Sequence, residues 1–210
     1  MLQPPSPDEL ADLFAYVVSI LERLSVPYRV IGGFAAITYG EPRLTLDVDI
    51  VVDMQHRHVD SFVAAFPIPE YYISRDGIVD SLTRRYPFNV IKPDTGAKVD
   101  LVPLPLDPYT RAAFGRRHPV IYDEIKGRGA DFATAEDVLL AKLSAYQKTD
   151  SEKHLRDARG ILVTQWGRLD LGSIHRWARA SGMEDTWQAL QEIARQETAG
   201  DEAAVNPSQG

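Results

Sequence analysis

Two aspartates separated by one residue begin an apolar run in the first quarter of the chain. They are Asp47 and Asp49, in the segment Leu-Asp-Val-Asp-Ile-Val-Val of residues 46–52. Side chains alternate along a strand, so residues two apart lie on the same face. Aspartate is unfavourable in strands, and two carboxylates on one face repel each other unless a cation or a proton lies between them. The pair therefore indicates a divalent-cation site, with an exposed strand end as the alternative.

A third carboxylate, Asp100, lies in the middle of a later apolar run at residues 98–104. If this run is a strand next to the first one, Asp100 would complete a two-metal site, because divalent cations take several oxygen ligands. Lys98 is two residues earlier and shares the face of Asp100. It could neutralise Asp100 or contact a phosphate, and we expect the salt bridge.

A glycine pair, Gly32-Gly33, follows the apolar run of residues 28–31 and precedes a short apolar segment at 33–39. Glycine lets the backbone approach a ligand closely. A helix beginning at this point would offer free N–H groups to a phosphate. Carboxylates for a cation together with amides for a phosphate are the parts of a phosphoryl-transfer or nucleotidyl-transfer site.

The elements that must position these residues follow from periodicity and turn residues. Ser6-Pro7-Asp8-Glu9 has the residues of a helix N-terminus, so we expect a helix over 7–24 that covers a sheet. Strands are predicted at 28–31, 46–53, 88–91, 98–104 and 120–125. Further helices are predicted at 33–39, 55–66, 76–85 and 107–114, and a loop at 127–129.

From residue 134 onward the sequence predicts four helices and no strand. The third of these helices is capped by Asp170, and the fourth covers 184–194. The expected fold class is therefore α+β, a mixed sheet with flanking helices followed by a helical C-terminal part. We expect a core at 1–120, a mainly helical domain at 121–197 and a disordered tail at 198–210.

Composition limits the function classes. The chain has 210 residues, 44% of them hydrophobic, and no cysteine, which excludes disulfides, thiol catalysis and cysteine–zinc sites. It has no apolar run long enough to span a bilayer and no signal-peptide pattern, so we expect a cytoplasmic protein without membrane contact. The net charge of −7 argues against a protein coated in nucleic acid. Residues 111–129 carry five Arg and Lys against two Asp and Glu, which could form a local approach to a polyanion or an ordinary solvated loop.

The glycine pair, the Asp47-x-Asp49 pair and the later strand aspartate together resemble the DNA polymerase β-like nucleotidyltransferase superfamily. Within it, Tyr39-Gly-x-x-Arg43-x-Thr45-x-Asp47-x-Asp49 looks like the AbiEii-type toxins and their uncharacterised relatives. The segment 136–143, which contains a lysine, and the segment 153–157, which ends in an aspartate, are similar to two helices of that family. The resemblance covers about residues 28–165.

The resemblance implies a role for each matching residue. A two-metal Mg²⁺ site, with Mn²⁺ as the alternative cation, would be held by Asp47, Asp49 and Asp100, and Asp100 would also take a proton from the attacking hydroxyl. The implied catalytic set is Asp47, Asp49, Asp100, Lys142 and Asp157. The implied nucleotide-binding set is Gly32, Gly33, Arg43, Thr45 and Lys142. Two readings stay open for Arg43, a phosphate contact or a structural brace, and Gly33 stands where many members carry serine.

The activity implied is transfer of a nucleoside monophosphate from a nucleoside triphosphate to an acceptor hydroxyl. The acceptor implied is RNA, such as the 3′ end of tRNA, for a toxin with a cognate antitoxin. A small hydroxylated molecule of the aminoglycoside kind, or a protein side chain, is the alternative acceptor. A nucleotide-binding regulatory module with little activity is a further alternative, and the complete set of Asp47, Asp49, Asp100 and Lys142 argues against it.

Overall fold

The computed structural model describes residues 4–205, with side chains described up to residue 198. The chain divides into two units. The first consists of the residues up to Phe34 together with Leu44–Ala133, and the second of Ala35–Arg43 together with the residues from Thr134 onward. Helix α2 (Gly32–Tyr39) begins in the first unit and ends in the second.

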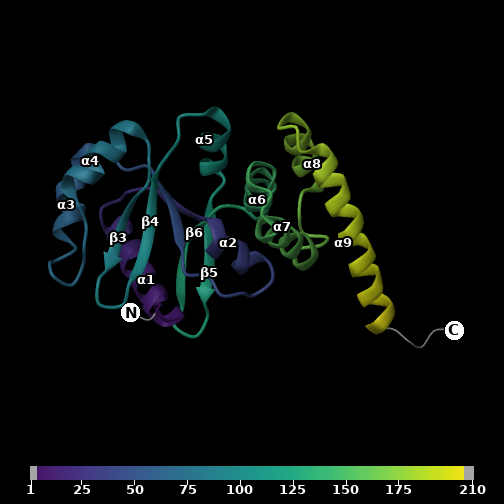
Figure 1. Cartoon of the computed structure of the whole chain (residues 1–210), viewed down its shortest axis with the longest axis horizontal. Coiled ribbons are helices and arrows are strands. Elements are labelled where there is room, and N and C mark those ends of the chain that lie inside the picture. The colour runs from purple at the N-terminus through teal and green to yellow at the C-terminus, as the bar shows by residue number, and fades with distance from the viewer. Residues whose placement is uncertain (1–3, 206–210) are drawn as a thin grey trace. The chain divides into compact units, whose positions relative to one another are not determined.

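Within the described residues, six strands of the first unit form one mixed sheet (Figure 1). They are β1 (Tyr28–Ile31), β2 (Val48–Val52), β3 (Phe88–Lys92), β4 (Ala97–Pro103), β5 (His118–Asp123) and β6 (Arg128–Phe132). The strand order across the sheet is β3-β4-β2-β1-β6-β5. The pairs β2–β4 and β1–β6 are parallel, and the other three pairs are antiparallel.

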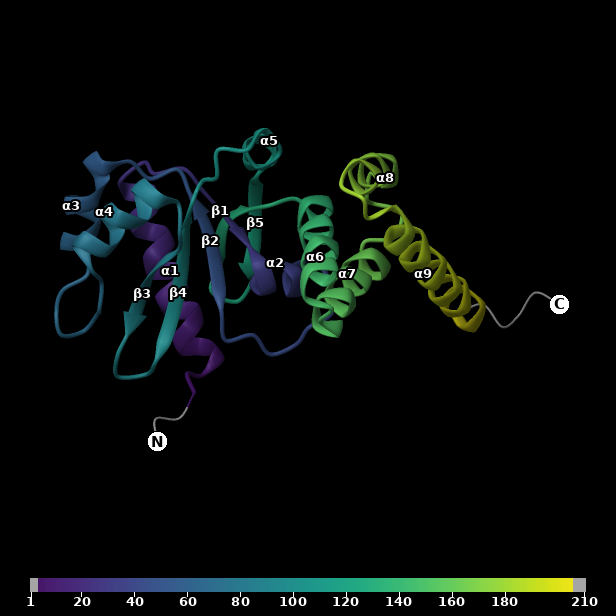
Figure 2. The same ribbon diagram turned by 45° about the horizontal axis from the view of Figure 1, so that its top comes forward.

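The helices of the first unit flank this sheet. They are α1 (Pro7–Arg23), the 3₁₀ turn η1 (His56–His58), α3 (Val59–Ala64), α4 (Arg75–Arg84) and α5 (Pro108–Gly115). Helix α1 packs against β4 and runs alongside it in both ribbon views (Figures 1 and 2), so the predicted cover of the sheet is confirmed. The helix predicted over 55–66 is shorter than expected, because its first turn is the separate 3₁₀ turn.

The two faces of the sheet differ in burial. On β4, Ala97, Val99 and Leu101 are fully buried, whereas Lys98 and Asp100 on the other face are partly exposed. Helix α5 covers part of this second face, where its Phe114 belongs to one apolar cluster with residues of β1, β2 and β4. The alternation predicted from the sequence is therefore confirmed, and the polar positions share a face that α5 covers only in part.

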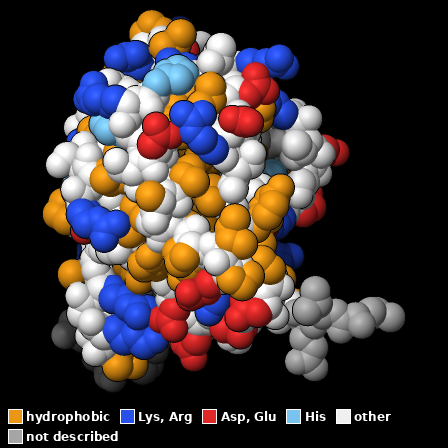
Figure 3. Space-filling view, turned by 90° about the vertical axis from the view of Figure 1, so that its left-hand side faces the viewer, with side chains coloured by type: hydrophobic (Ala, Val, Ile, Leu, Met, Phe, Trp, Pro, Cys, Tyr) orange, Lys and Arg blue, Asp and Glu red, His pale blue; other side chains and the backbone are white. Residues whose placement is uncertain are grey.

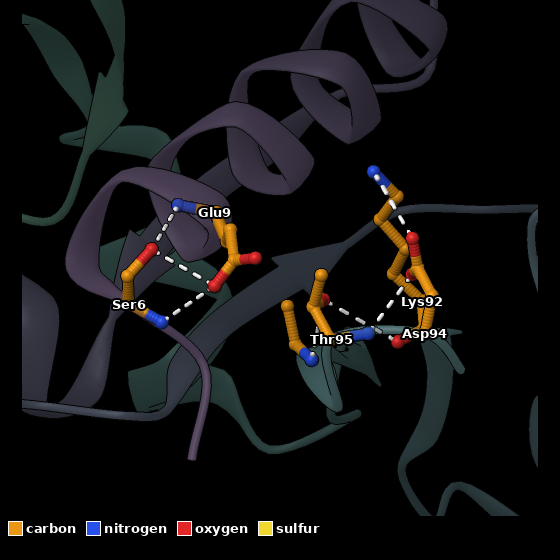
Figure 4. Close-up of polar contacts among 6 residues, drawn as sticks. Ser6, Glu9, Lys92, Asp94 and Thr95 are labelled. Atoms are coloured by element: carbon orange, nitrogen blue, oxygen red, sulfur yellow. Dashed lines mark hydrogen bonds and ion pairs between the residues drawn. The ribbon is translucent and has the colours of Figure 1, made fainter. Parts of the chain in front are cut away.

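The N-terminus of α1 is fixed by a reciprocal capping box (Figure 4). The backbone N–H of Ser6 donates to Glu9 Oε2 over 2.7 Å, and the backbone N–H of Glu9 donates back to Ser6 Oγ over 3.3 Å. These bonds satisfy N–H groups that have no partner inside the helix. The helix start predicted from Ser6-Pro7-Asp8-Glu9 is confirmed.

The β3–β4 hairpin closes through a turn of the expected kind (Figure 4). The N–H of Gly96 donates to Lys92 O over 2.8 Å, and the N–H of Thr95 donates to Asp94 Oδ1 over 2.9 Å. Gly96 has a φ of +75°, a conformation that residues with a side chain rarely adopt. The turn sets the register that places Asn89 opposite Asp100.

Two parts of the predicted chain order were wrong. Residues 127–129 were expected to be a loop, but Arg128–Phe132 is strand β6, which pairs with β5 and β1. The strand was missed because Gly129 interrupts its pattern of strand-forming residues. It was also missed because β6 pairs with β1, which is far away in the sequence. Since β5 and β6 belong to the sheet, the boundary after residue 120 was too early, and the first unit extends to Ala133.

The second unit is built of helices, as predicted. After the end of α2 these are α6 (Ala135–Thr149), α7 (Glu152–Thr164), α8 (Leu171–Ala180) and α9 (Glu184–Val205). Helix α7 packs against α6 and α9, and α8 packs against the same two helices. Trp187 of α9 is fully buried in this core. Helix α9 continues through residues 198–205, where a disordered tail was predicted, and residues 206–210 of that prediction lie outside the described residues.

The surface on the side of α3 and α4 mixes apolar side chains with charges of both signs (Figure 3). The segment between these helices exposes Ile68, at 83%, and Tyr72, at 59%. Such a mixture is the ordinary composition of a protein surface. Among residues 4–205, no helix combines the length and the apolar character needed to cross a bilayer.

Candidate active site

Asp49 and Asp100 lie side by side on the partly exposed face of the sheet. They are direct partners in the register of the parallel strands β2 and β4. Neighbouring strands are about 4.8 Å apart, so the two carboxylates project from adjacent positions on the same face. The side chain of Asp100 is 20% exposed, and solvent can therefore reach it. The strand adjacency predicted for the third carboxylate is present, and it comes from pairing between segments 51 residues apart.

The backbone of Gly32 lies directly against the Asp49 carboxylate. A Cβ atom at position 32 would be 2.1 Å from Asp49 Oδ2, and Gly32 has a φ of +72°. Glycine is therefore required at this position for two reasons, the backbone conformation and the close approach of the carboxylate. The sequence predicted a close approach at this glycine by a phosphate, and the structure shows a carboxylate there. The phosphate-binding role of Gly32 and Gly33 stays a prediction.

Lys98 forms an ion pair with Asp100 along strand β4. Its Nζ lies 2.7 Å from Asp100 Oδ2, which confirms the expected salt bridge. The hydrogen bond to Asp100 raises the pKa of Lys98, and the charges of Asp47 and Asp49 raise it further. One ammonium group thus lies within the electrostatic influence of all three aspartates.

Asp47 is exposed and lies one residue before β2. The hydroxyl of Thr45 donates to the backbone carbonyl of Asp47 over 3.3 Å, so it supports the backbone rather than the carboxylate. Among the described residues, no three His, Cys, Asp or Glu side chains already form a metal-binding group. The carboxylates nevertheless fit a divalent cation by their oxygen chemistry, and the Lys98 ammonium shows that Asp100 accepts a cation in this position.

A buried charge network lies within the second unit. Arg43 donates twice to Asp157, from Nε to Oδ1 over 2.7 Å and from Nη2 to Oδ2 over 2.8 Å. Lys142 Nζ of α6 lies 2.7 Å from the same Oδ2. The Asp157 side chain is 3% exposed and that of Lys142 is 8% exposed. The fold thus brings together Arg43, Lys142 and Asp157, three residues of the predicted catalytic and nucleotide-binding sets.

Asp157 is held ionised by these two cations. Burial alone would raise the pKa of Asp157, but the hydrogen bonds from Arg43 and Lys142 outweigh burial and hold the pKa below its ordinary value. The hydrogen bond to Asp157 in turn raises the pKa of Arg43. Of the two readings left open for Arg43, the bidentate geometry supports the structural brace. A contact of Lys142 with a triphosphate stays a prediction.

Two glycines that the sequence did not single out as a pair let the segment before Arg43 approach α7. A Cβ atom on Gly40 would be 2.8 Å from the backbone nitrogen of Ile161, and one on Gly160 would be 3.1 Å from that of Glu41. Gln165, the C-cap residue of α7, also donates from Nε2 to Tyr39 O over 2.8 Å. The Tyr39-Gly-x-x-Arg43 motif is thus a docking segment for α7 inside the second unit. The glycine in the motif was the available signal, but nothing in the sequence indicates its partner.

Each unit contains a cavity. The cavity of the second unit, of about 180 Å³, lies beside the Arg43–Asp157 pair and is also lined by Glu41 and Arg156. The cavity of the first unit is larger, about 460 Å³. It is lined by Asp53, Met54, Gln55, His56, Arg57, Leu82 and Arg85. Residues 53–57 of this lining follow the C-terminal end of β2, and Leu82 and Arg85 belong to α4 and its C-cap. Asp49 lies near the N-terminal end of β2, so the larger cavity is not the carboxylate site.

Three of the five cations of the basic segment 111–129 form ion pairs within the first unit. Arg117 pairs with Asp131 over 3.3 Å. Lys126 and Arg128 both pair with Asp12, over 3.5 and 2.7 Å. Of the two readings of this segment, the solvated surface with mixed charge is the one that these pairs support.

Solved structures share this fold. JHP933 from Helicobacter pylori matches with a TM-score of 0.52 at 15% identity, covering 98% of this chain and 100% of that one. ANT(2″)-Ia, crystallised in complex with adenylyl-2″-tobramycin, matches with a TM-score of 0.51 at 14% identity, covering 89% of this chain and 97% of that one. No protein-family model matches the chain, and no curated protein sequence matches it significantly.

The chain therefore has a nucleotidyltransferase fold. The predicted fold class, a mixed sheet with flanking helices followed by a helical C-terminal part, is confirmed. Membership of the nucleotidyltransferase superfamily, and of the AbiEii-type family within it, stays a prediction.

Proposed function

We propose that the protein is a Mg²⁺-dependent nucleotidyltransferase that moves a nucleoside monophosphate from a nucleoside triphosphate to an acceptor hydroxyl. One observation carries the proposal. In a nucleotidyltransferase fold, Asp49 and Asp100 are in register on adjacent parallel strands, with the backbone of Gly32 against Asp49. Two neighbouring carboxylates repel each other and destabilise the fold. A role as ligands of a divalent cation explains why both are present.

Each residue has a role in this proposal. Asp47, Asp49 and Asp100 would hold the cation, and Mn²⁺ could replace Mg²⁺ there. When bound, the cation offsets the charge of the phosphates and lowers the pKa of the attacking hydroxyl. Asp100 accepts the proton of that hydroxyl. As its oxygen bonds to the α-phosphorus, the bond from that phosphorus to pyrophosphate breaks and pyrophosphate leaves.

The remaining predicted residues bind and position. Backbone amides of Gly32 and Gly33, at the start of α2, bind the phosphates. On the strength of the motif resemblance, Lys142 offsets charge on the leaving pyrophosphate. Thr45 acts through the backbone carbonyl of Asp47, and Arg43 acts through the Asp157 carboxylate that it holds.

The first candidate acceptor is RNA, at a 3′ end such as that of tRNA, in a toxin with a cognate antitoxin. This candidate rests on the motif resemblance to the AbiEii-type family. The net charge of −7, and the ion pairs that hold three of the five cations of segment 111–129, reduce the positive charge that this segment offers to RNA. An RNA acceptor would therefore need other contacts.

The second candidate acceptor is a small hydroxylated molecule of the aminoglycoside kind. The fold match to ANT(2″)-Ia, whose structure holds adenylylated tobramycin, favours it. A small cationic acceptor also suits an acidic protein, because opposite charges attract.

Labelled transfer separates these candidates. The protein is incubated with each α-³²P-labelled nucleoside triphosphate, Mg²⁺ and either total RNA, tobramycin or total protein. Label on RNA supports the first acceptor, and label on tobramycin supports the second. No label on any acceptor, together with no nucleotide binding, would overturn the enzyme proposal.

A matched pair of variants tests the metal assignment. Asp49→Ala should abolish transfer and leave the circular dichroism spectrum unchanged. Asp60→Ala removes an aspartate whose side chain is 76% exposed and pairs with Arg75, so it should retain full transfer. Transfer retained by Asp49→Ala would refute the role of this carboxylate.

A further inference from the structure

We infer that Lys98 is an internal counter-ion, which holds the Asp100 carboxylate while no metal is bound and must release it before a divalent cation can bind. The inference rests on the proposed function, because it concerns the same carboxylates. It adds a residue that the nucleotidyltransferase resemblance does not assign.

The sheet geometry places Lys98 among the three aspartates. Lys98 and Asp100 are two residues apart on β4 and therefore share a face. The β2–β4 register sets Asp49 beside Asp100. Asp47 directly precedes β2, next to Val48, which is level with Val99 of β4.

The ammonium relieves repulsion that the fold would otherwise leave uncompensated. Three carboxylates and one ammonium carry a formal charge of −2 here, against −3 without Lys98. Like charges one strand spacing apart destabilise each other. The raised pKa of Lys98, due first to its bond with Asp100 and then to Asp47 and Asp49, reflects the same attraction.

The ammonium also competes with a metal for the same oxygen. Lys98 Nζ lies 2.7 Å from Asp100 Oδ2, whereas a bound Mg²⁺ approaches its oxygen ligands to about 2.1 Å. Two cations cannot share one oxygen at these distances without strong repulsion.

The Lys98–Asp100 ion pair can open so that a metal ion replaces the ammonium group. Its side chains are 37% and 20% exposed, and an ion pair with this much solvent contact is weak. The long lysine side chain can turn away into solvent without moving β4. The buried Lys142–Asp157 pair, with side chains 8% and 3% exposed, lacks this freedom.

Binding of Mn²⁺ without nucleotide tests the inference. Free Mn²⁺ is measured by electron paramagnetic resonance for the wild type, Lys98→Met and Lys92→Met. Lys98→Met should bind Mn²⁺ about fivefold more tightly, since it removes the competitor. Lys92→Met is the matched control, because Lys92 pairs with Asp94 over 3.9 Å in the hairpin turn (Figure 4) and should bind as the wild type does.

A second variant keeps the test independent of folding defects. Lys98→Arg keeps the positive charge and can bind a carboxylate bidentately, so it should bind Mn²⁺ no more tightly than the wild type. Equal or weaker Mn²⁺ binding by Lys98→Met, with wild-type binding intact, would overturn the inference and leave the proposed function standing. Absence of Mn²⁺ binding by the wild type would overturn both.

Thermal melting separates a counter-ion from a merely structural lysine. Without cation, Lys98→Met should melt below the wild type, because the carboxylates then repel without relief. With saturating Mn²⁺ this deficit should vanish or reverse. A deficit of the same size with and without Mn²⁺ would overturn the inference, since it would show that Lys98 supports the fold alone.

Discussion

Substitution of Gly32 by alanine tests the closest contact in the candidate site. The new methyl group would have to occupy space 2.1 Å from Asp49 Oδ2, on a residue whose φ is +72°. Non-bonded atoms prefer about 3.5 Å, so the carboxylate must move by roughly 1.5 Å. We expect Gly32→Ala to reduce both the stability of the fold and the binding of a cation at Asp49.

The magnitude has two parts. Alanine in the left-handed conformation costs about 1–2 kcal/mol relative to glycine. Overpacking against Asp49 adds about 1–3 kcal/mol. A displacement of this size at a reacting group lowers catalysis by about 100-fold.

Gly96→Ala isolates the first part. Gly96 has a similar φ of +75° in the same unit, but a Cβ atom there would meet nothing within 4 Å. Gly32→Ala should therefore melt roughly 2–12 °C below Gly96→Ala when followed by circular dichroism. Gly32→Ala should also bind Mn²⁺ more weakly, and Gly96→Ala should bind it normally. If the two variants melt together and bind Mn²⁺ equally, the close approach of Asp49 to Gly32 is not a feature of the folded protein.

Three further predictions concern the second unit. Asp157→Ala leaves Arg43 and the buried Lys142 without their anion and should lower the free energy of unfolding in urea by about 3–5 kcal/mol. Asp60→Ala removes an exposed pair and should change the free energy of unfolding by less than about 1 kcal/mol. The pKa of Asp157 is lowered in the folded state, so its contribution to the free energy of unfolding is complete above about pH 5 and is lost progressively below about pH 4. The difference in free energy of unfolding between the wild type and Asp157→Ala should therefore narrow in acid. A difference that stays constant with pH would contradict this prediction. Gly40→Ala should destabilise the protein by about 1–3 kcal/mol, because its methyl group would meet the backbone of α7. Gly115→Ala is the control, because a Cβ atom there has open space around it and should not destabilise the fold. Equal stability of the two variants would refute the close approach of Gly40 to α7.

Local and periodic features were predictable from the sequence. The capping box of Ser6 and Glu9 and the glycine turn at Gly96 involve residues within a few positions of one another. The burial of Val48 and Ile50 with Asp49 on the opposite face follows from the two-residue period of a strand. Strand β6 was missed because its glycine weakens the pattern and because its place in the sheet depends on a distant partner.

The sequence by itself determined which residues could do chemistry, namely the three aspartates, the glycine pair and Lys98 on the face of Asp100. Only the tertiary structure decided how they meet. Asp49 lies beside Asp100 because β2 and β4 pair in one particular register, and a shift of one residue would send one carboxylate to the buried face. Arg43 and Asp157 are 114 residues apart in the sequence, and neither carries a local signal of the other. Strand register and long-range ion pairs depend on the packing of the whole fold, so no pattern of neighbouring residues could have specified them.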